Sequence, residues 1–118
     1  MFVNAKVILM RCRHKKNLFG IRMQQISGAN WEFTWAFPVT EKRATNEGFD
    51  RERLTAKISF ADDYPGCPYC KSFGYVQCGN CGKLSCYDNR GEFQCAWCGQ
   101  ISNDMRETDE FDLLTGED

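Results

Sequence analysis

Seven cysteines stand close together between residues 67 and 98 of this chain. Six of them form three pairs with the spacing Cys-x-x-Cys, and one stands alone between the second and third pairs. A tight turn with this spacing lets two sulfur atoms approach one metal ion from the same side, and zinc takes four such ligands in a tetrahedron. The sequence therefore predicts zinc ligands at Cys67, Cys70, Cys78, Cys81, Cys86, Cys95 and Cys98.

The number of zinc ions is one or two, and we prefer two. Seven cysteines are too few for two complete four-ligand sites and too many for a single site. An eighth ligand would come from the N-terminal half, where Cys12 and His14 are the candidates. One position separates them, so on a strand their side chains point the same way.

The cysteine pairs can share the ions in more than one way. In the preferred hypothesis, the first and third pairs bind one ion, and the second pair binds the other ion together with Cys86 and the eighth ligand. In an alternative hypothesis, the first and second pairs bind one ion. In either arrangement, the glycines that follow the pairs let the backbone aim its amides at the sulfurs.

Catalysis is not expected from these residues. The stretch Cys67–Cys70 reads CPYC, as in the active-site dithiol of glutaredoxins, but that chemistry needs the first cysteine at a helix N-terminus. Here Gly74 and the β-prone residues 75–77 follow, so a CxxC redox protein is only a second alternative. The chain has one histidine and no HExxH, P-loop or GxSxG motif. All-cysteine zinc sites are usually closed and structural, so we predict that the protein is not an enzyme.

Short β-strands must position the cysteines. Residues 4–13 and 17–27 predict two strands joined by a polar turn, and residues 54–61 predict another strand. Residues 31–37 alternate strictly, which places Trp31, Phe33, Trp35 and Phe37 on one face of a further strand. A short helical turn is predicted at residues 41–46. The expected fold is all-β: a small antiparallel sheet of about four strands, packed by its aromatic face against a cysteine-rich zinc-ribbon-like module.

Composition divides the chain into three parts. Residues 1–62 form the antiparallel sheet part, residues 63–101 the zinc-ribbon-like metal-binding part, and residues 102–118 an acidic tail. The tail has one basic and seven acidic side chains, which predicts a solvated, flexible segment. In an alternative interpretation, residues 109–114 (DEFDLL) are a short docking motif.

Charge and targeting signals restrict the function and the compartment. The formal net charge is −1, although residues 1–62 carry 11 basic and 6 acidic side chains. This balance argues against a strongly basic nucleic-acid binder. A nucleic-acid-binding zinc ribbon is nevertheless the first alternative function. No signal peptide or membrane-spanning segment is recognised in the sequence, so the eight cysteines indicate metal rather than disulfides, and we expect a cytoplasmic protein.

Five short motifs carry a resemblance to a known family: TWAFPV, EGFD, YPGCPYC, CGKLSC and CAWCG, at residues 34–39, 47–50, 64–70, 81–86 and 95–99. Over about residues 4–101, the chain resembles the C-terminal metal-binding domain of TerY, a von Willebrand A-type protein of bacterial tellurium-resistance and stress-response systems. Two positions depart from the family pattern, since Lys71 replaces a glycine and Ala96 replaces a proline.

The resemblance implies a zinc-binding accessory module that acts through protein–protein interaction in a stress-response signalling system. It places the metal ligands on the seven cysteines named above. The implied partners are a von Willebrand A domain protein, a protein kinase or a PP2C-type phosphatase. No von Willebrand A domain precedes the module in this sequence, so we expect either an excised fragment or a free-standing member. Met1 together with the acidic tail favours the free-standing member.

Overall fold

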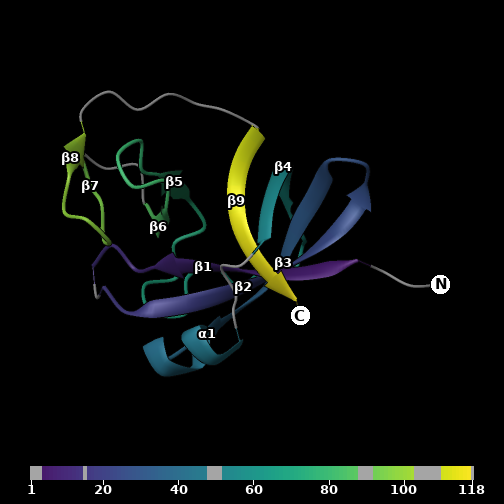
Figure 1. The fold of residues 1–118 in the computed structure, drawn as a ribbon, viewed down its shortest axis with the longest axis horizontal. Helices are drawn as coiled ribbons and strands as arrows, with labels where there is room; N and C mark the ends of the chain where they lie inside the picture. Colours follow the sequence, from purple (N-terminus) through teal and green to yellow (C-terminus); the bar gives the residue numbers. More distant parts are fainter. Residues whose placement is uncertain (1–3, 15, 48–51, 88–91, 103–109, 118) are drawn as a thin grey trace.

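The computed structural model describes residues 4–14, 16–47, 52–87, 92–102 and 110–117 (Figure 1). The described part of the chain is almost entirely β-structure, as expected, with a single short helix. Its elements are β1 (Ala5–Arg11), β2 (Leu18–Ser27), β3 (Asn30–Pro38), α1 (Glu41–Glu47), β4 (Glu52–Phe60), β5 (Tyr75–Gln77), β6 (Leu84–Cys86), β7 (Phe93–Gln94), β8 (Ile101–Ser102) and β9 (Glu110–Glu117).

Five of the strands close into a barrel. β1 and β2 form the predicted antiparallel hairpin, and β2 pairs in turn with β3. β4 lies parallel to β3, β9 lies antiparallel to β4, and β9 returns to β1, so the ring of hydrogen bonds is complete. The prediction of a purely antiparallel sheet was therefore wrong. A parallel pair needs a crossover connection, and the segment that contains α1 provides it.

The acidic C-terminal segment contributes a strand of the barrel rather than a flexible tail. β9 lies between β4 and β1 (Figure 1). In β9, Leu113 and Thr115 are buried, whereas Asp112 and Leu114 are exposed. A barrel strand needs apolar residues only at alternate positions, so acidic side chains on the other face are compatible with it. Of the suggested docking motif, residues 110–114 belong to this strand, and Asp109 lies outside the described residues.

Large apolar side chains fill the barrel interior. They include Ile8, Phe19, Ile21, Phe33 and Leu113, and each is at most 2% exposed. Cysteines of the second half belong to the same cluster of buried residues. The expected contact between the aromatic face of the sheet and the cysteine region is therefore confirmed for Trp31 and Phe33, and the barrel and the cysteine module share one core.

A β-bulge in β3 divides the aromatic residues that were predicted to share one face. Trp35 lies opposite Arg22 and Phe33 lies opposite Met23, so Thr34 is an extra residue in the pairing. One inserted residue reverses the inward and outward positions that follow it. Phe33 is consequently inside the barrel, Trp35 is 55% exposed, and Ala36 takes the next inward position.

A second, smaller cluster covers the outside of the barrel. Phe37, beyond the bulge, packs here beside Leu18 of β2 and Ala44 of α1. The hydroxyl of Thr40 accepts a hydrogen bond from the amide of Arg43 at 3.1 Å, which caps the short helix where a helical turn was predicted. A Cβ at Gly20 would lie 2.7 Å from the Phe37 ring, so a larger residue there would displace this ring.

The cysteine module is attached at one end of the barrel. β6 pairs in parallel with the end of β1, through Met10 opposite Leu84 and Arg11 opposite Ser85, and β5 pairs with β6. β7 and β8 form a separate two-stranded hairpin beside them (Figure 1). None of the described helical residues forms a stretch long and apolar enough to cross a membrane.

Candidate metal centre

All eight cysteines of the chain fall into two groups of four. In each group, the four sulfur atoms lie within 4.8 Å of one another, and none of the eight cysteines is in a disulfide. We call the first group the buried site, which consists of Cys12, Cys67, Cys70 and Cys86. We call the second group the peripheral site, which consists of Cys78, Cys81, Cys95 and Cys98.

The spacing of the sulfurs suits one tetrahedral ion in each group. A zinc–sulfur bond of about 2.3 Å places two sulfurs of a tetrahedron about 3.8 Å apart. In the buried site, the sulfurs of Cys70 and Cys86 are 3.5 Å apart. In the peripheral site, one sulfur pair is separated by 3.8 Å and another by 3.6 Å. Each group therefore has the size and the donor atoms of a four-thiolate metal site.

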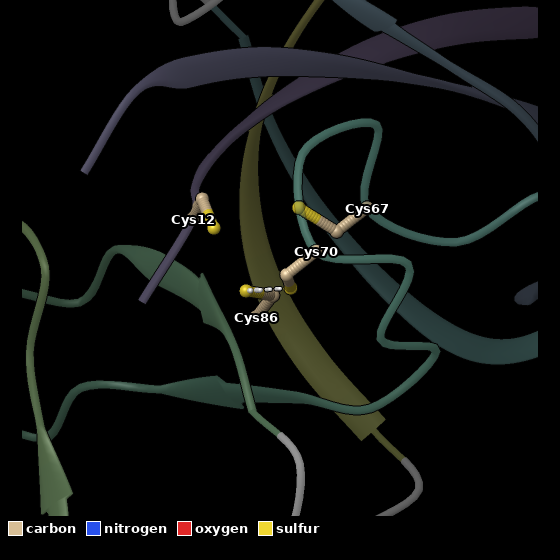
Figure 2. Close-up of side chains that lie close together, drawn as sticks. All are labelled: Cys12, Cys67, Cys70 and Cys86. Atoms are coloured by element: carbon tan, nitrogen blue, oxygen red, sulfur yellow. Dashed lines mark hydrogen bonds between the residues drawn. The ribbon is translucent and has the colours of Figure 1, made fainter. Parts of the chain in front are cut away.

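The buried site joins three segments that are distant in the sequence. Cys12 follows β1, Cys67 and Cys70 lie in the turn after β4, and Cys86 ends β6. Figure 2 shows their side chains gathered around a common centre. Cys12, Cys67 and Cys86 are at most 1% exposed. The site therefore lies within the core that the barrel and the cysteine module share.

The peripheral site joins two short turns at the edge of the molecule. Cys78 and Cys81 lie between β5 and β6, whereas Cys95 and Cys98 lie between β7 and β8. Cys98 is exposed to solvent, in contrast to the cysteines of the buried site. The two sites thus have the same donor atoms but different access to water.

The three Cys-x-x-Cys turns have the same backbone structure. In each, the amide of the first cysteine donates to the carbonyl five residues later, and the amide four residues later donates back to the first cysteine. These bonds are between 2.8 and 3.0 Å long. The residue after the second cysteine has a positive φ in every case: 68° at Lys71, 75° at Gly82 and 80° at Gly99.

Cys12 is presented by a fourth turn of the same kind. Its amide donates to the carbonyl of Asn17 at 3.0 Å, the amide of Lys16 donates back at 2.7 Å, and Lys16 has a φ of 59°. The position of a second cysteine is taken by Lys15, which is outside the described residues. Cys86, from another segment, completes the buried site in place of a second cysteine in this turn. In the sequence, Cys12 stands alone, and a single cysteine is a weak signal for a metal ligand.

Both predicted arrangements of the pairs were wrong. The second and third pairs face each other in the peripheral site, whereas the first pair joins Cys86 and Cys12. The reason is the parallel pairing of β6 with β1, which carries Cys86 to the end of the strand where Cys12 lies. Of the two candidates for an eighth ligand, the structure brings in Cys12, and it leaves His14 exposed and outside both groups.

Backbone amides point at the sulfurs in both sites. In the buried site, the amide of Arg13 lies 3.1 Å from the sulfur of Cys86. In the peripheral site, the amides of Asn80 and Trp97 lie 3.3 and 3.4 Å from the sulfurs of Cys78 and Cys95. Four thiolates around a divalent ion carry a formal charge of about −2, and such donors offset it.

Other hydrogen bonds to the sulfurs shift the pKa values of the thiols. A hydrogen bond from the Cys86 thiol lowers the pKa of Cys67 to about 5, with help from the amides of Cys70 and Tyr69, and the pKa of Cys86 rises in return. The amide of Gln100 and then the side chain of Asn80 lower the pKa of Cys98 to about 6. Each site therefore holds a thiolate at neutral pH, and thiolate is the form that binds metal.

Strand β6 connects the two sites through three consecutive residues. The carbonyl of Leu84 accepts a hydrogen bond of 2.6 Å from the indole of Trp97. The buried hydroxyl of Ser85 accepts one of 3.2 Å from the amide of Ala96. The next residue is Cys86 of the buried site, so the turn between Cys95 and Cys98 is fixed to the strand that supplies a ligand to the other site.

The turn at residues 67–70 is anchored to the barrel. The hydroxyl of Tyr69 donates to the carbonyl of Leu18 in the barrel at 2.8 Å. After this turn, the next described element is strand β5, and no helix begins between residues 64 and 77.

A Cβ at Gly74 would lie 2.3 Å from the carbonyl oxygen of Tyr87, so glycine allows the chain beyond Cys86 to pack here.

Comparison with known proteins agrees with the geometry. The chain matches the family described as the TerY-C metal binding domain over residues 3–117, which includes the whole barrel and both cysteine groups. No similar protein was found among curated proteins, and no similar structure was found among solved structures. With its two four-cysteine groups, which fit one or two metal ions, the chain belongs to the TerY-C metal binding domain family, a family of the tellurium-resistance systems.

Proposed function

We propose that the protein is a non-catalytic zinc-binding module that binds protein partners in a bacterial stress-response signalling system of the tellurium-resistance type. Each four-cysteine group binds one zinc ion, so the chain holds two. The observation that carries this proposal is the composition of the two groups, since each contains four cysteine sulfurs within 4.8 Å of one another.

Zinc is the metal that this donor set favours. Four thiolates in a tetrahedron are typical of zinc or of iron–sulfur centres. Sulfur–sulfur distances of 3.5 to 3.8 Å suit a single ion better than a larger cluster. Free cysteines need a reducing compartment, which supports a cytoplasmic location for the zinc-loaded protein.

A structural role follows from the closed coordination. A catalytic zinc ion keeps one position open for water, whereas four cysteines fill all the positions of a tetrahedral ion. The zinc ions would hold together segments with little secondary structure of their own, such as β5, β6 and the hairpin of β7 and β8. The outer surface of the barrel and of this module is then free to bind a von Willebrand A domain protein, a protein kinase or a PP2C-type phosphatase.

Native mass spectrometry tests the metal part of the proposal. We expect two zinc ions per chain in the wild type and one in the Cys12→Ser variant, because serine cannot supply a thiolate. His14→Ala is the matched control and should keep both ions. One zinc ion in the wild type, or an iron–sulfur chromophore, would contradict the proposal.

The interaction part needs a separate measurement. We expect the zinc-loaded protein to co-purify with a von Willebrand A protein, kinase or phosphatase of the same bacterium, and to lose this partner when the metal is removed. Tight binding to DNA or RNA that weakens steeply with salt would instead favour the nucleic-acid-binding zinc ribbon.

A further inference from the structure

A pocket of about 250 Å³ lies on the outside of the barrel, between α1 and the peripheral site. Its apolar walls include Leu9 and Leu18 of the barrel, Ala44 of α1, and Trp97 from the turn between Cys95 and Cys98. Sites for drug-sized ligands usually measure about 300–1,000 Å³. This pocket is smaller, and its size suits a few side-chain groups better than a whole cofactor.

Of the charged groups that line the pocket, the ammonium group of Lys83 can face a negatively charged ligand. Glu41 lines the pocket, but its carboxylate already pairs with Arg11. Lys83 also lines the pocket, and its ammonium group lies 4.5 Å from the centre of the Trp97 ring. Within the described ranges, no carboxylate pairs with Lys83. A ligand that brings a negative charge beside an apolar group would therefore complement this site.

We propose that this pocket binds a linear acidic peptide of a protein partner. A large apolar side chain of the peptide enters between Leu18, Ala44 and Trp97, and a carboxylate of a neighbouring residue faces Lys83. The inference rests on the proposed function as a protein-interaction module and names the surface that carries it. Burial of the apolar side chain supplies affinity, and the charge selects acidic sequences.

The peripheral site holds one wall of this pocket in place. Trp97 lies between two of its cysteines, and Lys83 follows the turn that carries Cys81. The indole of Trp97 is fixed by its hydrogen bond to Leu84, and the guanidinium of Arg11 lies 4.3 Å from its ring centre. The walls from the barrel and α1 do not contain metal ligands. Peptide binding should therefore require metal in the peripheral site.

Selection from a randomised phage-displayed peptide library on the zinc-loaded protein tests the proposal. We expect the enriched peptides to share a large apolar residue next to Asp or Glu. Lys83→Glu should weaken their binding roughly tenfold or more, since it reverses the charge that faces the carboxylate. Lys57→Glu, an exposed charge reversal on β4 outside the pocket, is the matched control and should leave binding unchanged.

Two further variants distinguish binding of the peptide in the pocket from a general effect of charge. Ala44→Phe fills the pocket and should abolish binding, and Cys98→Ser, which removes a ligand of the peripheral site, should do the same. Their zinc content and thermal unfolding report whether the fold is kept. Failure to enrich such peptides, or equal binding by the wild type and the Lys83→Glu variant, would overturn the proposal.

The proposed function can fail separately from this inference. If the wild type and the Lys83→Glu variant co-purify with the same partner equally well, the protein is an interaction module that uses another surface, and the pocket proposal is wrong. If the wild type recovers no partner from its own bacterium while the selected peptides bind the pocket, the pocket proposal stands and the proposed signalling role fails.

Discussion

The hydroxyl of Ser85 accepts a hydrogen bond of 3.2 Å from the amide of Ala96, and this buried contact joins the two metal sites. Removal of the hydroxyl leaves a partly buried amide without its partner. We expect Ser85→Ala to lower the free energy of unfolding by about 1–3 kcal/mol. Chemical denaturation of the zinc-loaded protein measures this change.

The exposed Ser59 provides the control for that experiment. Its hydroxyl makes only a long contact of 3.5 Å with the carbonyl of Trp31, so Ser59→Ala should change the stability by no more than about 0.5 kcal/mol. Equal stability of the Ser85→Ala variant and the wild type would show that the contact does not couple the sites.

Metal should leave the two sites at different rates. Cys98 of the peripheral site is exposed, whereas Cys12 of the buried site has no exposed surface. A chelator reaches the buried ion only after the shared core opens, so we expect two phases of zinc release that differ roughly tenfold or more in rate. A chromogenic chelator follows both. The Cys98→Ser variant should lack the fast phase, and a single phase in the wild type would contradict the prediction.

Metal binding should release more protons as the pH falls. The pKa values of Cys98 and Cys67 are lowered to about 6 and about 5, so both are thiolates in the metal-free protein at neutral pH. A thiolate releases no proton when zinc binds, but a thiol releases one. Each site should therefore release one more proton per zinc below these values, and its zinc affinity should fall more steeply with pH there. Calorimetry in buffers of different ionisation enthalpy measures the protons released, and a proton count independent of pH would exclude the lowered pKa values.

The positive φ angles in the metal turns predict opposite effects for two substitutions. Gly82→Ala adds a Cβ that meets no atom within 4 Å, so the cost is the left-handed backbone alone, about 1 kcal/mol. Lys71→Gly relieves the same strain at a φ of 68° and should stabilise the protein by up to about 1 kcal/mol. Thermal unfolding with zinc bound measures both.

Gly79 is the matched control for these turns. It is equally open, but its φ is not in the left-handed region, so Gly79→Ala should not be destabilising. If Gly79→Ala and Gly82→Ala lower the stability by the same amount, the backbone conformation is not the cause of the lost stability.

Neighbouring leucines in β9 test whether this strand completes the barrel. Leu113 is 2% exposed inside the barrel, and Leu114 is 43% exposed on the outside. Leu113→Ala should cost about 2–5 kcal/mol of unfolding free energy, whereas Leu114→Ala should cost less than about 1 kcal/mol. Denaturant titration measures the difference. Similar small effects at both positions would place residues 110–117 outside the folded core.

Local patterns in the sequence predicted the elements well, because each depends on adjacent residues. The hairpin of β1 and β2, the strand at β4 and the helical turn at α1 follow from alternation and turn residues. The alternation in β3 failed beyond Thr34, since the bulge there depends on the partner strand. The sequence of one strand does not reveal it.

Long-range pairing explains why the other predictions from the sequence were wrong. The role of β9 was missed because its few inward residues, such as Leu113, stand among acidic side chains that suggest a flexible tail. The division of the cysteines depends on β6 lying parallel to β1, which no spacing within residues 67–98 encodes. Cys12 was a candidate only from the count of ligands, and its turn carries one cysteine where the others carry two.

The place of β9 in the barrel also determines the order in which the molecule can assemble during translation. Residues 110–117 leave the ribosome after all eight cysteines, so the barrel cannot close until both sets of metal ligands are already outside the exit tunnel. Metal can therefore bind the nascent chain before the last described strand joins β1 and β4. We therefore expect metal supply during synthesis to influence how many chains reach the closed fold.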